Sequence, residues 1–171
     1  MRSWIGFAFA CVAACGSSGG GNHNSTDAGS GSGGGHFVTW DFNGTSYSGS
    51  MLATATLGSN EAGGDMPSVE AADANGAILA LGVVPATPET IAAPGTYTVS
   101  PTSTAPFAAI QMTLGSDTWK ADGSGGSGEI TITAISTGDF TGTFSGTLVP
   151  VDGNANGSGA LTNGAFDLAP N

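Results

Sequence analysis

From His36 to the end of the chain, no segment longer than eight residues shows helical periodicity without an interrupting Gly or Pro. Gly weakens a helix interior by about 1 kcal/mol and Pro by about 3 kcal/mol, so such a chain does not sustain helices of ordinary length. Short runs of alternating apolar and polar residues recur instead, with turn residues between them. The pattern predicts an all-β domain, either an antiparallel β-sandwich or a closed barrel of about ten short strands.

The clearest local signal is Asn43-Gly44, which stands between two alternating runs. Asn-Gly favours a two-residue type I′ hairpin, because both of its central residues adopt positive φ. Such a turn places Trp40 directly across from Tyr47, on the face that we expect to form the core. Continuing the same alternation along the chain places Met51 on this core face as well.

Later runs of the same kind predict further strands, and the proline-rich segments between them predict loops. Gly142 and Gly146 fall on the same face as Phe144, which indicates sharp curvature or close packing of another element there. Besides the hairpin, strands are expected over residues 69–72, 77–84, 95–99, 107–114, 117–121, 129–135, 140–149 and 159–168.

The chain begins with Arg2 and an uncharged apolar run over residues 4–14. This run is too short to span a bilayer as a helix and is typical of a signal peptide. The residues at 12–15, Val-Ala-Ala-Cys, resemble the lipobox of bacterial lipoproteins. The resemblance implies cleavage before Cys15, attachment of a diacylglycerol to its sulfur and acylation of the new amine. Cys11 is the rival position, and a plain secretory signal cut at the same place is the alternative.

Residues 16–35 are twenty in number, fourteen of them Gly or Ser, and we expect them to form a disordered tether. As a flexible coil this tether reaches roughly 25 Å. Because Gly16 and not Asp follows the cysteine, the resemblance favours the outer membrane of a Gram-negative cell, with the leaflet left open. The sequence therefore divides into a signal peptide over 1–14, the lipidated Cys15 with its tether over 15–35, and a single β domain over 36–171.

The chain after Cys15 is acidic, with thirteen Asp and Glu against one base, Lys120, so its net charge is −12. This balance excludes nucleic acid as a partner and also excludes charge-driven binding to anionic head groups. The expected domain contains one histidine, His36, and no cysteine, so neither a Ser-His-Asp site nor a zinc site is expected. Paired carboxylates of a glycoside hydrolase are the enzymatic alternative, and the chain is expected not to be an enzyme.

Asp152, Asn154 and Asn156, followed by Gly, match the first half of a calcium-binding loop. No Glu stands at the position that completes this motif, so a second acid such as Asp65 or Asp122 is required. We interpret the segment as an ordinary polar turn and keep a weak calcium site as the alternative. No other cofactor is expected.

Two further patterns bear on binding. Gly123, Gly125 and Gly128 match a dinucleotide fingerprint by letter only, because a strand and not a helix is expected to follow. Trp119, beside Lys120 on a short strand, is the candidate for an exposed aromatic contact, such as stacking on a sugar.

Five segments, taken in order, resemble small all-β bacterial lipoproteins of unknown function. They are Trp40–Tyr47, Pro94–Tyr97, Gly128–Thr133, Gly142–Thr147 and Thr162–Phe166. The resemblance supports the fold and implies no activity and no site. The sequence thus predicts a non-catalytic protein, anchored in the membrane through acyl chains, that binds an unidentified envelope glycan or protein. A structural or coat lipoprotein without a specific ligand is the alternative.

Overall fold

The computed structural model describes residues 36–57, 66–84, 93–99, 106–152 and 155–170, and these residues form strands and turns without a helix. This part of the chain therefore contains no helix long and apolar enough to cross a membrane. The strands are β1 (Phe37–Phe42), β2 (Thr45–Ser48), β3 (Leu52–Thr56), β4 (Ser68–Ala72), β5 (Ala77–Val84), β6 (Gly95–Thr98), β7 (Phe107–Leu114), β8 (Asp117–Ala121), β9 (Ser127–Ser136), β10 (Asp139–Asp152) and β11 (Gly159–Leu168).

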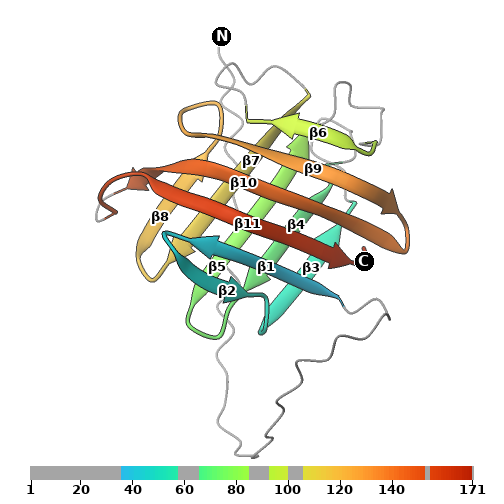
Figure 1. Ribbon diagram of the computed structural model, residues 1–171, viewed down its shortest axis with the longest axis horizontal. Helices are drawn as coiled ribbons and strands as arrows, with labels where there is room; N and C mark the ends of the chain where they lie inside the picture. The colour runs from blue at the N-terminus through green and yellow to red at the C-terminus, as the bar shows by residue number, and fades with distance from the viewer. Residues whose placement is uncertain (1–35, 58–65, 85–92, 100–105, 153–154, 171) are drawn as a thin grey trace, which may run out of the picture. The chain divides into compact units, whose positions relative to one another are not determined.

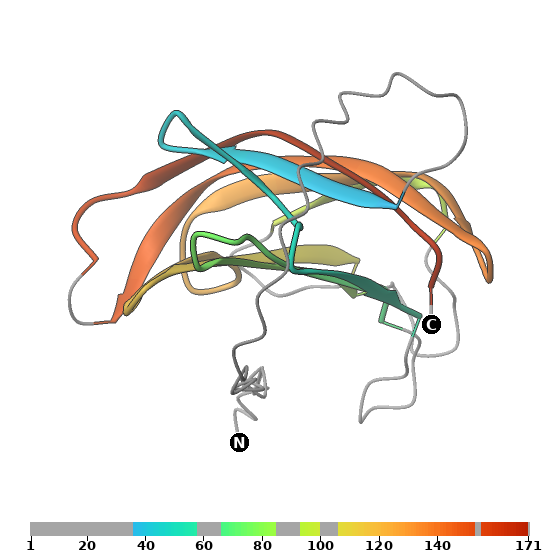
Figure 2. The same cartoon turned by 90° about the horizontal axis from the view of Figure 1, so that it is seen from below.

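All these strands belong to one antiparallel sheet in the order β2-β1-β11-β10-β8-β7-β5-β4-β3, and β9 and β6 branch from β10. The sheet curls into a half-barrel, so that its two halves face each other (Figures 1 and 2). We call β2, β1, β11, β10, β9 and β6 the front half, and β8, β7, β5, β4 and β3 the back half. The prediction of an antiparallel all-β domain is confirmed, with eleven strands.

Among the described residues, backbone hydrogen bonds do not close the half-barrel into a full barrel. In the described structure β2 and β3, at the two ends of the strand order, do not pair with each other. Single bridges join the halves at two corners. Ala55 of β3 pairs with Pro170, which follows β11, and Val99, which follows β6, pairs with Ala108 of β7. These bridges hold the edges of the two halves together around the core.

The first hairpin has the predicted geometry. Asn43 and Gly44 have φ of 51° and 79°, as a type I′ turn requires. Trp40 pairs with Tyr47, and their rings stack with centroids 5.7 Å apart. Met51 was predicted to join this core face, and that prediction is wrong: 73% of its surface is exposed. Met51 lies in a bend before β3 begins, so the period-two alternation of a strand does not extend to it.

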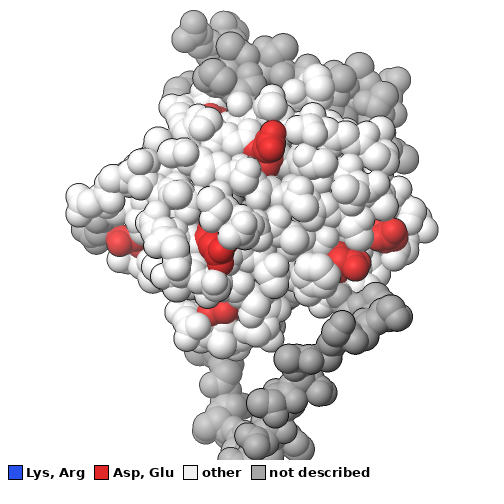
Figure 3. All heavy atoms as spheres, in the orientation of Figure 1, with Lys and Arg blue, Asp and Glu red and all other residues white. Residues whose placement is uncertain are grey.

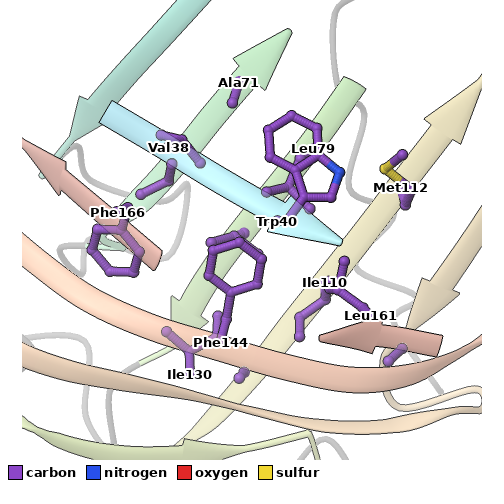
Figure 4. Close-up of a cluster of buried hydrophobic side chains, with 14 of the residues drawn as sticks. Val38, Trp40, Ala71, Leu79, Ile110, Met112, Ile130, Phe144, Leu161 and Phe166 are labelled. Atoms are coloured by element: carbon purple, nitrogen blue, oxygen red, sulfur yellow. The ribbon is translucent and has the colours of Figure 1, made fainter. Parts of the chain in front are cut away.

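The core lies inside the curl and draws on both halves (Figure 4). One buried cluster joins front-half side chains such as Trp40 and Phe166 with back-half side chains such as Leu79 and Met112, and all four are nearly or completely buried. A cavity of about 10 Å³ lies against Phe166, and this is at or below the size that one water molecule needs. The interior at this point is filled by the protein's own side chains.

Glycines on the inner face let aromatic rings lie directly on the backbone. A Cβ built on Gly142 of β10 comes within 2.6 Å of the Phe166 ring. Gly164 lies under Phe144 and Gly159 lies under Phe42 in the same manner. The close packing predicted at Gly142 is confirmed. At these positions any side chain larger than hydrogen displaces an aromatic ring of the core.

We predict that Gly142→Ala lowers the free energy of unfolding by about 1–3 kcal/mol, because the added methyl group would meet both the Thr131 carbonyl oxygen of β9 and the Phe166 ring. The matched control is Gly82→Ala in the interior of β5, where a built Cβ has no heavy atom within 4 Å. The measurement is urea denaturation of both variants beside the wild type. Equal destabilisation by the two substitutions would contradict the close packing of β9 and the Phe166 ring against Gly142.

Candidate functional site

Several residues singled out from the sequence lie outside the described part of the chain. Cys15 and Asn154 are among them, and of Asp152 only the backbone is described, at the end of β10. Asn156 is described and exposed. The calcium loop therefore remains an untested hypothesis.

Of the two acids proposed as its second carboxylate, Asp122 is described and Asp65 lies outside the described residues. Asp152 pairs with Thr118 at the start of β8, whereas Asp122 follows the other end of that strand. Asp122 is four positions from Thr118 along the chain, roughly 13 Å in an extended strand. Asp117 directly precedes Thr118, and its Oδ1 is buried without a hydrogen-bond partner among the described residues. Of the described acids, Asp117 and not Asp122 adjoins the start of the loop.

Trp119 was expected to offer an exposed aromatic contact, and this expectation is wrong. Only 7% of Trp119 is exposed, and its ring meets Phe42 edge to face at 5.1 Å between centroids. Its Nε1 donates a hydrogen bond to the Gly157 carbonyl at 3.1 Å. Alternation along β8 sends Trp119 inward and its neighbour Lys120 outward, and the sequence did not show which of the two faces the core.

The outer face of the front half carries a broad polar surface. A single row of paired residues crosses its six strands, from β2 through β1, β11, β10 and β9 to β6. Five of the six side chains in this row carry a hydroxyl group. In order they are Ser48, Thr39, Ala165, Thr143, Thr131 and Thr96. We call the outward side chains of the front half the hydroxyl face.

Neighbouring hydroxyls on this face hydrogen-bond to each other across strands. Thr96 and Thr131 are joined at 3.0 Å, and Thr133 and Thr141 are joined at 3.0 Å. Residues on adjacent strands lie about 4.8 Å apart and every second residue along a strand about 6.7 Å apart, so the hydroxyls repeat in two dimensions. The surface can donate and accept hydrogen bonds over a broad area.

Acids are spread singly over this face, without bases beside them (Figure 3). Asp41 lies on β1, and the Nδ2 of Asn163 on the neighbouring strand β11 donates a hydrogen bond to the Oδ2 of Asp41 at 2.7 Å. The hydrogen bond from the Ser46 side chain, and then that from Asn163, lower the pKa of Asp41. The described lysine, Lys120, is on the back half and pairs with Asp122 at 3.1 Å. The hydroxyl face is therefore weakly anionic.

A second polar feature, which the sequence analysis did not single out, is Asp73 in the turn between β4 and β5. Only 7% of Asp73 is exposed. Its Oδ1 accepts the Asn75 N–H at 2.7 Å and its Oδ2 accepts the Ser48 N–H at 3.1 Å. These backbone hydrogen bonds, that of Asn75 first, lower the pKa of Asp73. Asp73 thus fastens the end of β2 to the β4–β5 turn.

Metal binding and general acid chemistry have little support among the described residues. They contain no group of three or more His, Cys, Asp or Glu placed to hold a metal ion. Burial acts to raise the pKa of Asp122, but hydrogen bonds from Ser124 and the neighbouring Lys120 outweigh it and lower the pKa. With Asp41 and Asp73, the shifted carboxyl groups all move downward. A general acid requires the opposite direction.

Comparison with known proteins gives no relative: no protein-family model, no curated protein and no solved structure matches this chain.

Asp73 makes the stability of the domain depend on pH in a defined direction. A carboxyl group with a lowered pKa in the folded state stabilises the fold fully above its unfolded pKa of about 3.9. This contribution is lost as the pH falls through the lower, folded-state pKa. We therefore predict that Asp73→Asn melts at a lower temperature than the wild type at pH 7, and that the difference shrinks towards pH 2.5.

Thermal unfolding followed by circular dichroism from pH 7 to pH 2.5 measures this difference. The control is Glu70→Gln, an exposed acid on the adjacent strand β4. A difference between Asp73→Asn and the wild type that stays constant with pH would show that the charge of Asp73 is not what stabilises the turn.

Proposed function

We propose that this protein is a non-catalytic, lipid-anchored domain of the cell envelope, and that its hydroxyl face binds a polysaccharide of that envelope. The observation that carries the proposal is the row of paired residues that crosses the six strands of the front half, with a hydroxyl side chain on every strand except β11. Hydroxyl groups both donate and accept hydrogen bonds, as those of sugars do. A repeating array of them matches a repeating polymer better than it matches a compact ligand.

The charge of the protein favours a neutral polymer. The acids Asp41, Glu129 and Asp167 point outward from the front half, and its described residues include no Lys or Arg. Phosphate-rich polymers require cationic or bidentate groups, which this face does not offer. The filled interior near Phe166 favours binding on the surface, because a carrier of small molecules needs a chamber of several hundred Å³.

The lipid anchor at Cys15 is the second element of the proposal. The lipobox-like residues 12–15 and the Gly/Ser segment 16–35 support it. A tether of roughly 25 Å keeps the domain within reach of the polymers that lie next to the membrane.

We predict that Cys15→Ser releases the protein from the membrane fraction, because without acyl chains the acidic chain has no strong attraction to lipid. Membrane fractionation with detection of the protein in each fraction measures this. Cys11→Ser is the control and is expected to leave the protein in the membrane. Release by Cys11→Ser alone would move the anchor to the rival position.

We predict that replacing Thr131 and Thr143 by Val weakens co-sedimentation with an insoluble envelope polysaccharide by about 2–12-fold per hydroxyl, the value of one net hydrogen bond each. Valine keeps the volume and β-branching of threonine, so the strands are retained. The control pair is Thr113→Val with Thr118→Val, which removes two cross-strand hydroxyls from the back half.

Purified peptidoglycan sacculi and an insoluble neutral glucan are the two probes. If the wild type sediments with neither, polysaccharide binding is wrong and the structural or coat role becomes the better description. The pairing of Thr96 with Thr131, which leaves these hydroxyls partly satisfied, is the observation in favour of that alternative.

A further inference from the structure

Exposed apolar side chains gather at one end of the back half. Leu52 of β3 pairs with Ala72 of β4, and Ala72 pairs in turn with Ile78 of β5. Cross-strand partners point to the same face, so these three residues lie side by side on the outer surface. Met51 directly precedes Leu52, and its N–H donates to the Ala72 carbonyl at 3.0 Å, so its backbone adjoins the same residues. We call Met51, Leu52, Ala72 and Ile78 the apolar patch.

The described residues expose few large hydrophobic side chains, and most of these belong to the apolar patch. Met51, Leu52 and Ile78 are 73%, 43% and 46% exposed, and Phe37 is the one other large hydrophobic residue exposed among the described residues. Single exposed apolar residues are normal on a soluble protein, whereas a contiguous group of them marks a contact site. The four residues of the patch are uncharged, and the exposed acid Glu70 lies on the same face of β4, two residues from Ala72.

The apolar patch begins on β3, and the tether enters the domain beside that strand. His36, the first described residue, accepts a hydrogen bond at Nδ1 from the Ala169 N–H at 2.9 Å. The next residue, Pro170, forms the bridge to Ala55 of β3. Leu52 is three residues from Ala55 along the same strand, roughly 10 Å. The segment that leads to Cys15 therefore joins the domain beside β3, the strand on which the patch begins.

We propose that the apolar patch docks into the interface of the bilayer in which Cys15 is anchored, so that the domain lies on the membrane in a fixed orientation. The inference rests on the lipid anchor proposed above. A tether of twenty residues, with a reach of roughly 25 Å, confines the patch close to the lipid surface. A flexible linker of this kind gives an effective concentration in the millimolar range, so a weak apolar contact is enough for docking.

A second copy of the chain is the competing occupant, and the size of the patch argues against it. A standard protein interface buries about 800 Å² on each partner. Three partly exposed side chains, those of Met51, Leu52 and Ile78, supply far less than this area. Insertion into a lipid interface has no such minimum, because its strength scales with the apolar area that is buried.

Oxidation of Met51 by chloramine-T, a charged oxidant that attacks water-exposed thioethers, tests the proposal. The lipidated full chain is placed on phosphatidylcholine vesicles, and the reference is the Cys15→Ser full chain mixed with the same vesicles. Oxidation of Met51 is read by peptide mass. We expect it to be about 5-fold slower in the anchored protein, which corresponds to docking for about 80% of the time. Met112, which is 0% exposed, reports within the same sample that the fold is intact.

The variant that removes the docking contact and keeps the reporter is Leu52→Thr with Ile78→Thr. We expect its Met51 to be oxidised at the rate of the unanchored chain, while the protein still floats with the vesicles. Phe37→Thr, which removes the exposed apolar side chain of the front half, is the control and is expected to keep Met51 protected. If Met112 becomes reactive in the double variant, Ile78→Thr alone replaces it.

The remaining outcomes overturn the proposal in different ways. A wild-type chain that floats with the vesicles and is oxidised at the reference rate keeps its anchor and has no docked patch. A wild-type chain that does not float removes the anchor, and the docking inference with it. Protection of Met51 in the vesicle-free Cys15→Ser chain that rises with protein concentration identifies a second copy as the occupant.

Discussion

The structure depends on the long strand β10, which is shared by both halves of the sheet. Its first part hydrogen-bonds to β11 on one edge and β9 on the other, and its last residues pair with β8. Gly142 and Gly146 make this arrangement fit, because a Cβ at either position would meet the backbone of β9. Phe166 fills the space above Gly142, so the strand is covered from inside without a side chain of its own there. The curl of the sheet, and with it the core, follows from this one strand.

The two halves of the curled sheet turn their core side chains towards each other, and their two outer faces point away from each other (Figure 2). The outer face of the front half carries cross-strand hydroxyls and scattered acids, and that of the back half carries the apolar patch beside the entry of the tether. The two proposals are consistent with each other on this geometry. Docking of the back half on lipid turns the hydroxyl face away from the membrane, towards the polymers of the envelope.

Local sequence chemistry was most reliable where a residue type demands one backbone conformation. Asn43-Gly44 specified its turn and hence the pairing of Trp40 with Tyr47, because few other residues tolerate positive φ at both positions. It failed where a side chain's direction depends on where a strand begins or which face is covered. Met51 sits in a bend one residue before β3, and Trp119 turns inward against Phe42. In both cases a shift of one residue exchanges the core face for the outer face.

The sequence by itself determined the all-β class, most strand positions and the acidic balance, and it predicts the anchor at Cys15. Each of these follows from residues that are close together in the chain or from composition alone. The tertiary structure alone decided that the sheet curls into a half-barrel, that Thr39, Thr131 and Thr143 fall in one row, and that Leu52 lies level with Ile78. These arrangements join residues 12 to 104 positions apart. Their register is fixed by packing across the core, which no local pattern encodes.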